Sequence, residues 1–233
     1  MWYNFFMDSE YYLSLIKNKY GAEFSSFNEM LQNKNKVCNL TSICDEKGVL
    51  YKHFLDSLAG EGLFKENSDV IEIGSGGGFP SVPLMIVRKD LRFTLIESTG
   101  KKCNYLEEVV EKLGLNCVQV LNIRAEEGAH SENLREKFDI SCARAVARLN
   151  TLSEYCLPYV KVGGRFIAYK GDADGEIKEA ERAIKILGGE IEDIIKYSLP
   201  EDEGKRTLIC VRKISHTPEK YPRGQGRERK QPL

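Results

Sequence analysis

The chain has 233 residues, of which 42% are hydrophobic and 30% are charged, and its formal net charge at pH 7 is −1. This length and composition suit one globular α/β domain with a buried core and a small appendage. They argue against a membrane protein, because no apolar run approaches the roughly 18 residues of a span, and against a zinc or disulfide framework, because none of the seven cysteines forms a CxxC pair.

Residues 1–58 are predicted to form an N-terminal helical segment. Apolar residues recur at helical spacing over residues 12–16 and 24–31, and no strand alternation competes. The first twelve residues lack the basic start and the uninterrupted apolar run of a signal peptide, so we expect a cytoplasmic location.

From residue 69 onward, short apolar strands alternate with helical patterns. Strands are predicted at 69–73, 92–97, 117–122, 138–142 and 164–169. Helices are predicted from Pro80 to about Lys89, from Lys101 to Leu113, around 150–158 and over 175–187. Residues 190–197 and 206–212 are expected to pair antiparallel. This order predicts a Rossmann-like domain over residues 59–213, with a mostly parallel sheet and helices on both faces.

Charge is unevenly distributed towards the C-terminus. Residues 172–203 contain 11 acidic and 4 basic residues, whereas residues 212–233 contain 7 basic and 2 acidic residues. The acidic outer face of the helix predicted over 175–187 accounts for much of the acidic excess. The basic excess predicts that residues 214–233 form a tail that contacts phosphates, with a solvated terminus as the alternative.

A glycine-rich turn, residues 74–80, follows the first strand directly. Glycines at Gly74 and Gly76 allow the backbone to approach a ligand closely, although a purely structural turn is an alternative. The dinucleotide fingerprint G-x-G-x-x-G/A requires a small residue where this chain has Phe79. The loop therefore departs from the dinucleotide form.

Two acidic residues favour S-adenosylmethionine as the ligand. Glu97 ends the second strand, where a carboxylate accepts hydrogen bonds from ribose hydroxyls. Ala125 and Glu126 follow the third strand at the same edge of the sheet, where a backbone N–H and a carboxylate suit an adenine. This cofactor needs a ribose clamp and an adenine site but no pyrophosphate cradle.

At these residues the sequence resembles the bacterial 16S ribosomal RNA guanine-N7 methyltransferases, also called glucose-inhibited division protein B. The matching segments span nearly the whole chain: 39–41, 52–58, 73–80, 95–98, 124–126, 143–147, 169–171 and 221–224. Two departures are Ser81, where glycine is commoner in the family, and Thr99, where leucine is.

The resemblance implies a seven-stranded methyltransferase sheet and methylation of one guanine in the decoding-region loop of 16S rRNA. The substrate would be the small ribosomal subunit or its assembly intermediate, with no membrane and no obligate protein partner. Predicted cofactor-binding residues are Gly74, Gly76, Phe79, Glu97, Ser98, Ala125, Glu126 and Arg144. Predicted RNA-binding residues are Lys170, Arg223, Arg227, Arg229 and Lys230.

Some of these residues have a structural alternative. Arg144 suits the methionine carboxylate of the cofactor or an RNA phosphate, but equally a structural ion pair. Lys170 suits a phosphate or simple solvation. His53 and Asp56 face either the substrate or a helix-packing contact.

The reaction is expected to need no catalytic side chain and no metal. At the end of the fourth strand, residues 141–145 read Ser-Cys-Ala-Arg-Ala, in the place where amino-group methyltransferases have an Asn/Asp-Pro-Pro-aromatic loop. Cys142 is expected to be a packing residue, like most of the cysteines, which are predicted to be reduced and buried. Guanine N7 offers a lone pair without a proton to remove. The remaining alternatives are a methyltransferase for another RNA site or a small molecule, and an RNA-binding protein on an inactive cofactor fold.

Overall fold

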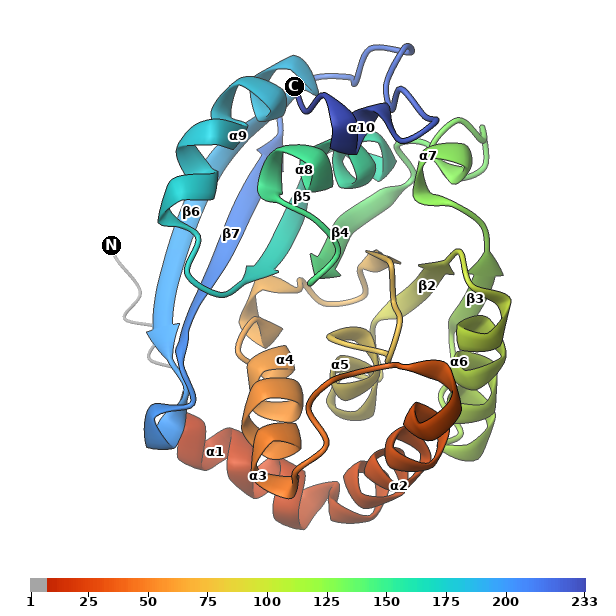
Figure 1. Cartoon of the computed structure of the whole chain (residues 1–233), viewed down its shortest axis with the longest axis vertical. Helices are drawn as coiled ribbons and strands as arrows, with labels where there is room; N and C mark the ends of the chain where they lie inside the picture. Colours follow the sequence, from red (N-terminus) through yellow and green to blue (C-terminus); the bar gives the residue numbers. More distant parts are fainter. Residues whose placement is uncertain (1–7) are drawn as a thin grey trace.

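The structure, a computed structural model, describes residues 8–233 and is built on a seven-stranded sheet (Figure 1). The strand order is β3-β2-β1-β4-β5-β7-β6. The strands are β1 (Asp69–Ile73), β2 (Arg92–Glu97), β3 (Val118–Asn122), β4 (Phe138–Arg144), β5 (Val160–Lys170), β6 (Gly189–Ser198) and β7 (Lys205–Lys213). Strands β1 to β5 are parallel, whereas β7 is antiparallel to both β5 and β6. The predicted mostly parallel sheet and its antiparallel last pair are confirmed.

Helices precede and connect these strands. The α-helices are α1 (Ser9–Ser14), α2 (Gly21–Cys38), α3 (Glu46–Gly48), α4 (Asp56–Leu58), α5 (Ser81–Val87), α6 (Gly100–Lys112), α7 (Ala125–Gly128), α8 (Leu149–Cys156), α9 (Asp174–Ile186) and α10 (Arg227–Lys230). Wider π-helical turns cover Leu15–Lys19 and Val49–Leu55, and 3₁₀ turns cover Glu61–Leu63, Leu157–Tyr159 and Pro200–Asp202. The N-terminal helical segment is confirmed for the described residues, and it is interrupted by a loop at 39–45.

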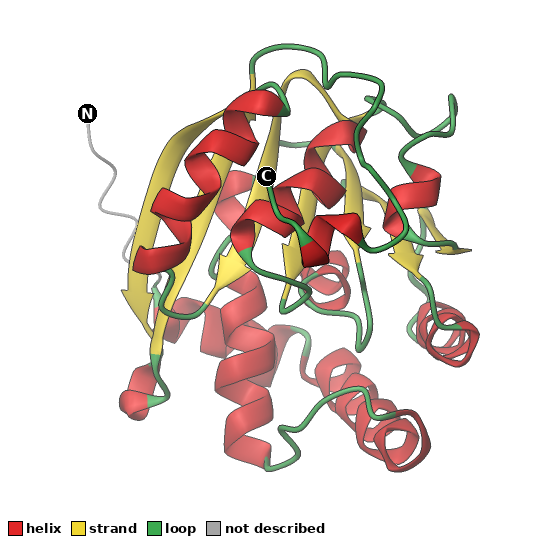
Figure 2. Cartoon of the chain, turned by 45° about the horizontal axis from the view of Figure 1, so that its top comes forward, coloured by secondary structure: helices red, strands yellow, loops and turns green. Residues whose placement is uncertain are grey.

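The sheet is covered by helices on both faces because its strands are apolar on both sides (Figure 2). In β1, Val70 faces a core shared with α1, α2, α5 and α6, whereas Ile71 and Ile73 face a second core shared with α8 and α9. Side chains that alternate along each strand thus bury two layers of helices. The N-terminal helices belong to the first of these cores, because Phe27 and Leu31 of α2 are completely buried in it.

Several smaller expectations concern single segments. Cys103, Cys142, Cys156 and Cys210 are buried, as predicted for most of the thiols. Within residues 8–233, no helix is long and apolar enough to cross a membrane. The expectation about a signal peptide concerns residues 1–12, of which 1–7 lie outside the described residues.

The last twenty residues lie against the α8 side of the domain. The short helix α10 contacts α8 (Figure 1). Thr217, Tyr221 and Glu228 of this segment are buried.

Candidate active site

A cavity of about 930 Å³ opens at the carboxyl ends of the parallel strands. Its lining includes all eight residues that the sequence predicted to bind the cofactor: Gly74, Gly76, Phe79, Glu97, Ser98, Ala125, Glu126 and Arg144. These residues come from four different strand ends or loops. Their convergence is expected, because ligands of open α/β sheets bind at the carboxyl ends of the strands where the strand order changes direction. Here that point lies between β1 and β4: β1 to β3 follow one another in one direction, and β4 and β5 in the other.

The glycine loop, residues 74–80, begins with backbone bonds that fix its path. The N–H of Gly74 donates to the carbonyl of Ile96 at 2.8 Å, which ties the loop to β2. Gly74 and Gly76 have φ angles of +71° and +51°, values that side-chain-bearing residues rarely adopt. A Cβ on Gly74 would lie 2.8 Å from Cγ2 of Val146, whereas a Cβ on Gly76 would meet nothing nearer than 3.7 Å. Gly74 is therefore required by packing, and Gly76 leaves open space on the cavity side.

Glu97 closes the base of this loop from the end of β2. One carboxylate oxygen accepts the N–H of Gly76 at 3.1 Å, and the other accepts the N–H of Thr99 at 2.8 Å. The side chain is buried but lines the cavity. A carboxylate has about four acceptor positions, so two remain for hydroxyl groups of a ligand after these bonds are made.

The segment after β3 forms a neighbouring part of the wall. Ser98, Ala125 and Glu126 line the cavity together with the buried ring of Tyr155. The carbonyl of Ala125 accepts the hydroxyl of Tyr159 at 2.6 Å, which fixes the start of α7. A backbone N–H, a carboxylate and an aromatic ring are thus available side by side for a planar base.

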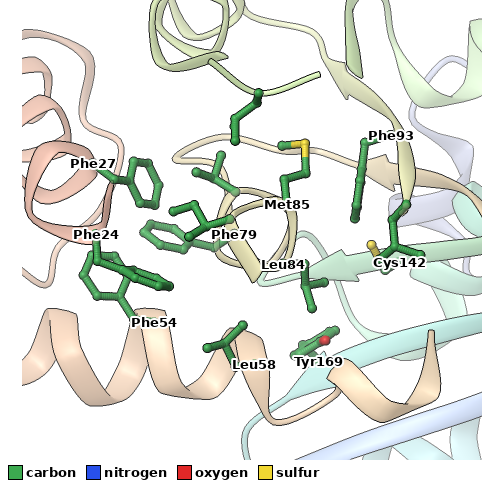
Figure 3. Close-up of a cluster of buried hydrophobic side chains, with 14 of the residues drawn as sticks. Phe24, Phe27, Phe54, Leu58, Phe79, Leu84, Met85, Phe93, Cys142 and Tyr169 are labelled. Atoms are coloured by element: carbon green, nitrogen blue, oxygen red, sulfur yellow. The ribbon is translucent and has the colours of Figure 1, made fainter. Parts of the chain in front are cut away.

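Phe79 joins the glycine loop to the N-terminal helices (Figure 3). Its ring centroid lies 5.2 Å from that of Phe27 and 6.2 Å from that of Phe54. The His53 ring stacks on it at 4.4 Å, and the guanidinium carbon of Arg144 lies 4.8 Å from its centroid. A glycine at this position would leave that aromatic cluster incomplete, which agrees with the predicted departure from the dinucleotide loop.

Arg144, at the end of β4, is held by three acceptors. It donates to the carbonyl of Lys52 at 2.9 Å, to Oδ2 of Asp56 at 3.1 Å and to Nδ1 of His53 at 3.1 Å. Nε2 of His53 lies 2.8 Å from the hydroxyl of Thr41. Burial and the positive charge of Arg144 lower the pKa of His53 to about 3, so the imidazole is neutral at physiological pH. Arg144 therefore makes a structural ion pair, and its bonds use three of its five N–H groups.

Arg206 and Tyr197 complete this polar cluster, and the sequence analysis did not single them out. The hydroxyl of Tyr197 donates to Oδ1 of Asp56 at 2.7 Å, and Nε of Arg206 lies 3.3 Å from the same oxygen. Asp56 thus faces two guanidinium groups. Arg206 also lines the cavity. No local pattern in β7 marks this residue, because its role depends on the packing of the β6–β7 pair against α4.

Among the residues predicted to bind RNA, Lys170 and Arg229 line the cavity. Nζ of Lys170 donates to the carbonyl of Ala147 at 2.9 Å and pairs with Glu176 at 2.7 Å. The side chain of Lys170 is only 10% exposed, so most of it is already engaged by the protein.

The other three predicted RNA-binding residues lie outside the cavity lining. Arg223 forms a two-pronged ion pair with the buried carboxylate of Glu154, with N···O distances of 2.9 and 2.8 Å. Arg227 and Lys230 are exposed on α10. Arg229 is exposed as well, and none of Arg227, Arg229 and Lys230 makes an ion pair with another described residue.

Glu72 is a third residue that was not predicted from the sequence. It lies inside β1, is completely buried and accepts a short hydrogen bond from the hydroxyl of Ser81. Its other carboxylate oxygen has no partner among the described residues. Burial raises the pKa of Glu72 to about 7. An acidic residue inside the apolar run Val-Ile-Glu-Ile is a signal that was present in the sequence.

Comparison with known proteins identifies the family. Residues 21–207 match the family model described as rRNA small subunit methyltransferase G. The chain belongs to this family. The proteins named ribosomal RNA small subunit methyltransferase G from Clostridium botulinum and Lactobacillus johnsonii are 43% and 44% identical to it. Those alignments cover 95% and 94% of this chain, and 93% of each relative. The resemblance inferred from the sequence motifs is confirmed.

Solved structures agree on the fold. A SAM-dependent O-methyltransferase from Thermotoga maritima matches with a TM-score of 0.53 and 18% identity, over 81% of this chain and 72% of that one. A SAM-dependent methyltransferase from Aquifex aeolicus matches with a TM-score of 0.54 and 17% identity, over 78% of this chain and 97% of that one. The Rossmann-like methyltransferase class is therefore confirmed.

As a member of this family, the chain is an S-adenosylmethionine-dependent methyltransferase, and its cavity fits that cofactor. Two unused acceptor positions on Glu97 suit the two ribose hydroxyls. The open space beside Gly76 is a cradle that a Cβ would fill. The ribose clamp on Glu97 and the cofactor contact of the glycine loop remain predictions.

Proposed function

We propose that this methyltransferase modifies N7 of one guanine in 16S rRNA, in the cytoplasm, on the small ribosomal subunit or an assembly intermediate. The observation that carries the proposal is the division of the cavity into two halves. The predicted cofactor contacts Glu97, Ala125 and Glu126 follow β2 and β3, whereas Arg144, Lys170 and Arg206 belong to β4, β5 and β7. Because these strand sets lie on opposite sides of β1, an RNA substrate would enter beside the second set.

The charge of the cavity supports an anionic substrate. Its cationic lining residues are Lys52, Lys102, Arg124, Arg144, Lys170, Arg206 and Arg229, and its acidic ones are Asp56, Glu97, Glu126 and Glu176. Seven cations thus face four carboxylates in a protein whose net charge is −1. Guanidinium groups pair well with phosphate oxygens, so we assign phosphate contacts near the target nucleotide to Arg144 and Arg206. The exposed Arg227 and Lys230 are proposed to contact more distant phosphates.

The protein residues act by binding and orientation. S-adenosylmethionine supplies, when bound, a methyl group on a positively charged sulfur. Guanine N7 carries no proton, so no protein group has to remove one. Glu97 and the glycine loop would hold one reactant and the β4–β7 cations the other, which is an orientation effect. We propose residues 59–213 as the unit that performs this transfer and residues 1–58 as a separate N-terminal segment, whose described part, residues 8–58, covers one face of that unit.

The proposed function is tested by mapping methyl groups in rRNA. Small subunits from a strain that lacks the protein are incubated with purified protein and labelled cofactor. The expected result is label at N7 of a single guanine in 16S rRNA. Label at another position or on another molecule would refute the proposed substrate, and tight cofactor binding without any transfer would favour an RNA-binding protein.

The rate of the chemical step is expected to be nearly independent of pH. His53 lines the cavity but stays neutral, and burial raises the pKa of Tyr155 above its ordinary value of 10.0. Neither side chain changes its charge near neutrality. Single-turnover rates with saturating cofactor and RNA should vary by less than about twofold from pH 6 to 9. A rate that rises tenfold per pH unit, and loses this slope in one side-chain variant, would reveal a general base.

A further inference from the structure

The C-terminal strap, which we define as residues 214–233, is joined to the domain by charged side chains. The guanidinium of Arg135 donates to four backbone carbonyls, three of which belong to the strap. These acceptors are the carbonyls of Ala129, Thr217, Pro218 and Tyr221, at 2.8 to 3.2 Å. Nζ of Lys213 is completely buried and donates to the hydroxyl of Thr217 at 2.6 Å. The first half of the strap is thus bound to the domain without any RNA.

The second half of the strap has its own buried contacts. Glu154 of α8 has a fully buried side chain and accepts both the guanidinium and the backbone N–H of Arg223. Glu228 is also fully buried, and it accepts a short bond from the N–H of Gly224. The hydroxyl of Thr151 in α8 donates to the carbonyl of Glu228 at 2.8 Å. These bonds fix the position of α10 on α8.

Fixed in this way, the strap contributes directly to the cavity. Gly226 and Arg229 line it, together with Glu126 and Tyr155. Burial raises the pKa of the Tyr155 phenol, and the nearby guanidinium of Arg229 partly offsets this rise. Arg229 therefore lies beside the part of the wall that suits a planar base.

Arg229 also contacts the loop after β4, residues 145–148. Its Nη2 donates to the carbonyl of Val146 at 3.4 Å. The side chain of Val146 packs against Gly74, where it leaves no space for a Cβ. Ala145, the preceding residue, has a φ angle of +57°, a strained conformation for alanine that its surroundings must maintain. A chain of contacts thus runs from Arg229 through Val146 to the glycine loop.

We propose that the C-terminal strap is a wall of the cofactor site and that Arg229 is a positioning residue for S-adenosylmethionine binding. Arg229 holds the loop after β4 against the glycine loop and closes the adenine side of the cavity. All three cations of α10 are exposed, but Arg227 and Lys230 do not line the cavity, and the RNA role is assigned to these two. The strap therefore has two sides with different ligands, although its sequence shows only one basic cluster.

The test compares two neighbouring arginines in the full-length protein. Affinity for S-adenosylhomocysteine is measured by calorimetry without RNA, for the wild type, Arg229→Ala, Arg229→Lys and Arg227→Ala. The hydrogen bond that is lost is long and exposed, so the value for an ordinary hydrogen bond applies, and we expect affinity to be about five- to tenfold weaker for Arg229→Ala. Arg229→Lys should recover part of the loss, and Arg227→Ala should bind like the wild type. The proposal rests on cofactor binding in this cavity, which the wild-type titration tests separately.

Hydrogen exchange gives an independent readout of the same coupling. Binding is reciprocal, so S-adenosylhomocysteine should slow exchange at the amides of Arg229 and Lys230 in α10 and of Gln231 just after it, which are bonded to backbone carbonyls. This protection should shrink in Arg229→Ala. Unchanged cofactor affinity in Arg229→Ala would overturn the proposal, whether RNA affinity falls or only the thermal unfolding midpoint does. An equal loss in Arg227→Ala would also overturn it, because a general charge effect would then explain both.

Discussion

Replacement of Glu97 by alanine is expected to weaken the binding of S-adenosylhomocysteine by at least about tenfold. The carboxylate has acceptor positions left for two ribose hydroxyls, and each hydrogen bond to a charged group contributes about 1.5–3 kcal/mol. The substitution also leaves the N–H groups of Gly76 and Thr99 without the acceptor they have in the structure. The glycine loop should therefore lose order as well as its ligand contact. Calorimetry measures the first effect, and thermal unfolding of the cofactor-free protein measures the second.

The matched control is Glu127→Ala, thirty residues along the chain. Glu127 is exposed and adjoins Glu126, but it is not among the residues that line the cavity. Its replacement removes the same charge and should leave cofactor affinity unchanged. Glu97→Gln retains one acceptor oxygen and should bind with intermediate affinity. If Glu97→Ala folds and binds the cofactor as tightly as Glu127→Ala does, the ribose clamp has been placed on the wrong residue.

The sheet and its helices were predictable because their signals are local. Short apolar strands that alternate with amphipathic helices imply parallel pairing, and this rule places the carboxyl ends of the strands at one edge. The glycine loop, Glu97 and Ala125-Glu126 all follow strand ends, so their convergence in one cavity could be inferred without a structure. The bounds of β5 were less accurate: this strand begins at Val160, four residues before the predicted start. Gly163 and Gly164 interrupt its apolar pattern, so the pattern does not reveal the residues at the start of the strand.

The polar contacts between distant segments were not predictable in the same way. Arg206 meets Asp56 only because the β6–β7 pair packs beside α4, and Arg223 meets Glu154 only because the C-terminal strap crosses α8. Each contact joins residues separated by at least 69 positions in the chain. The cluster of positive charge from residue 212 onward was visible, but composition cannot show that Arg223 is ion-paired, that Arg229 lines the cavity and that Arg227 does not.

Glu72 is expected to make the stability of the folded protein depend on pH near neutrality. Burial raises its pKa from 4.5 to about 7 in the folded protein. Between these two values the folded state holds a proton that the unfolded state has released, so stability decreases as pH rises. The stabilising contribution is complete below pH 4.5 and is lost as the pH passes through about 7. A shift of this size corresponds to a loss of about 2–3 kcal/mol in the free energy of unfolding between pH 5 and pH 8.

Glu72→Gln removes this titration, because the amide resembles the protonated acid at every pH. Its oxygen can still accept the hydroxyl of Ser81, while its NH₂ group replaces an oxygen that has no partner among the described residues. Any cost of that unpaired group is independent of pH, so the informative quantity is the difference between variant and wild type. Denaturant unfolding at pH 5, 6, 7 and 8 should show this difference moving by about 2–3 kcal/mol in favour of Glu72→Gln as pH rises. For the exposed control Glu127→Gln, the free energy of unfolding should change with pH in the same way as for the wild type. If the free energy of unfolding of Glu72→Gln also changed with pH in parallel with the wild type, the buried carboxylate would titrate near its ordinary pKa. Its charged form would then be stabilised by a group that the contacts of β1 do not reveal.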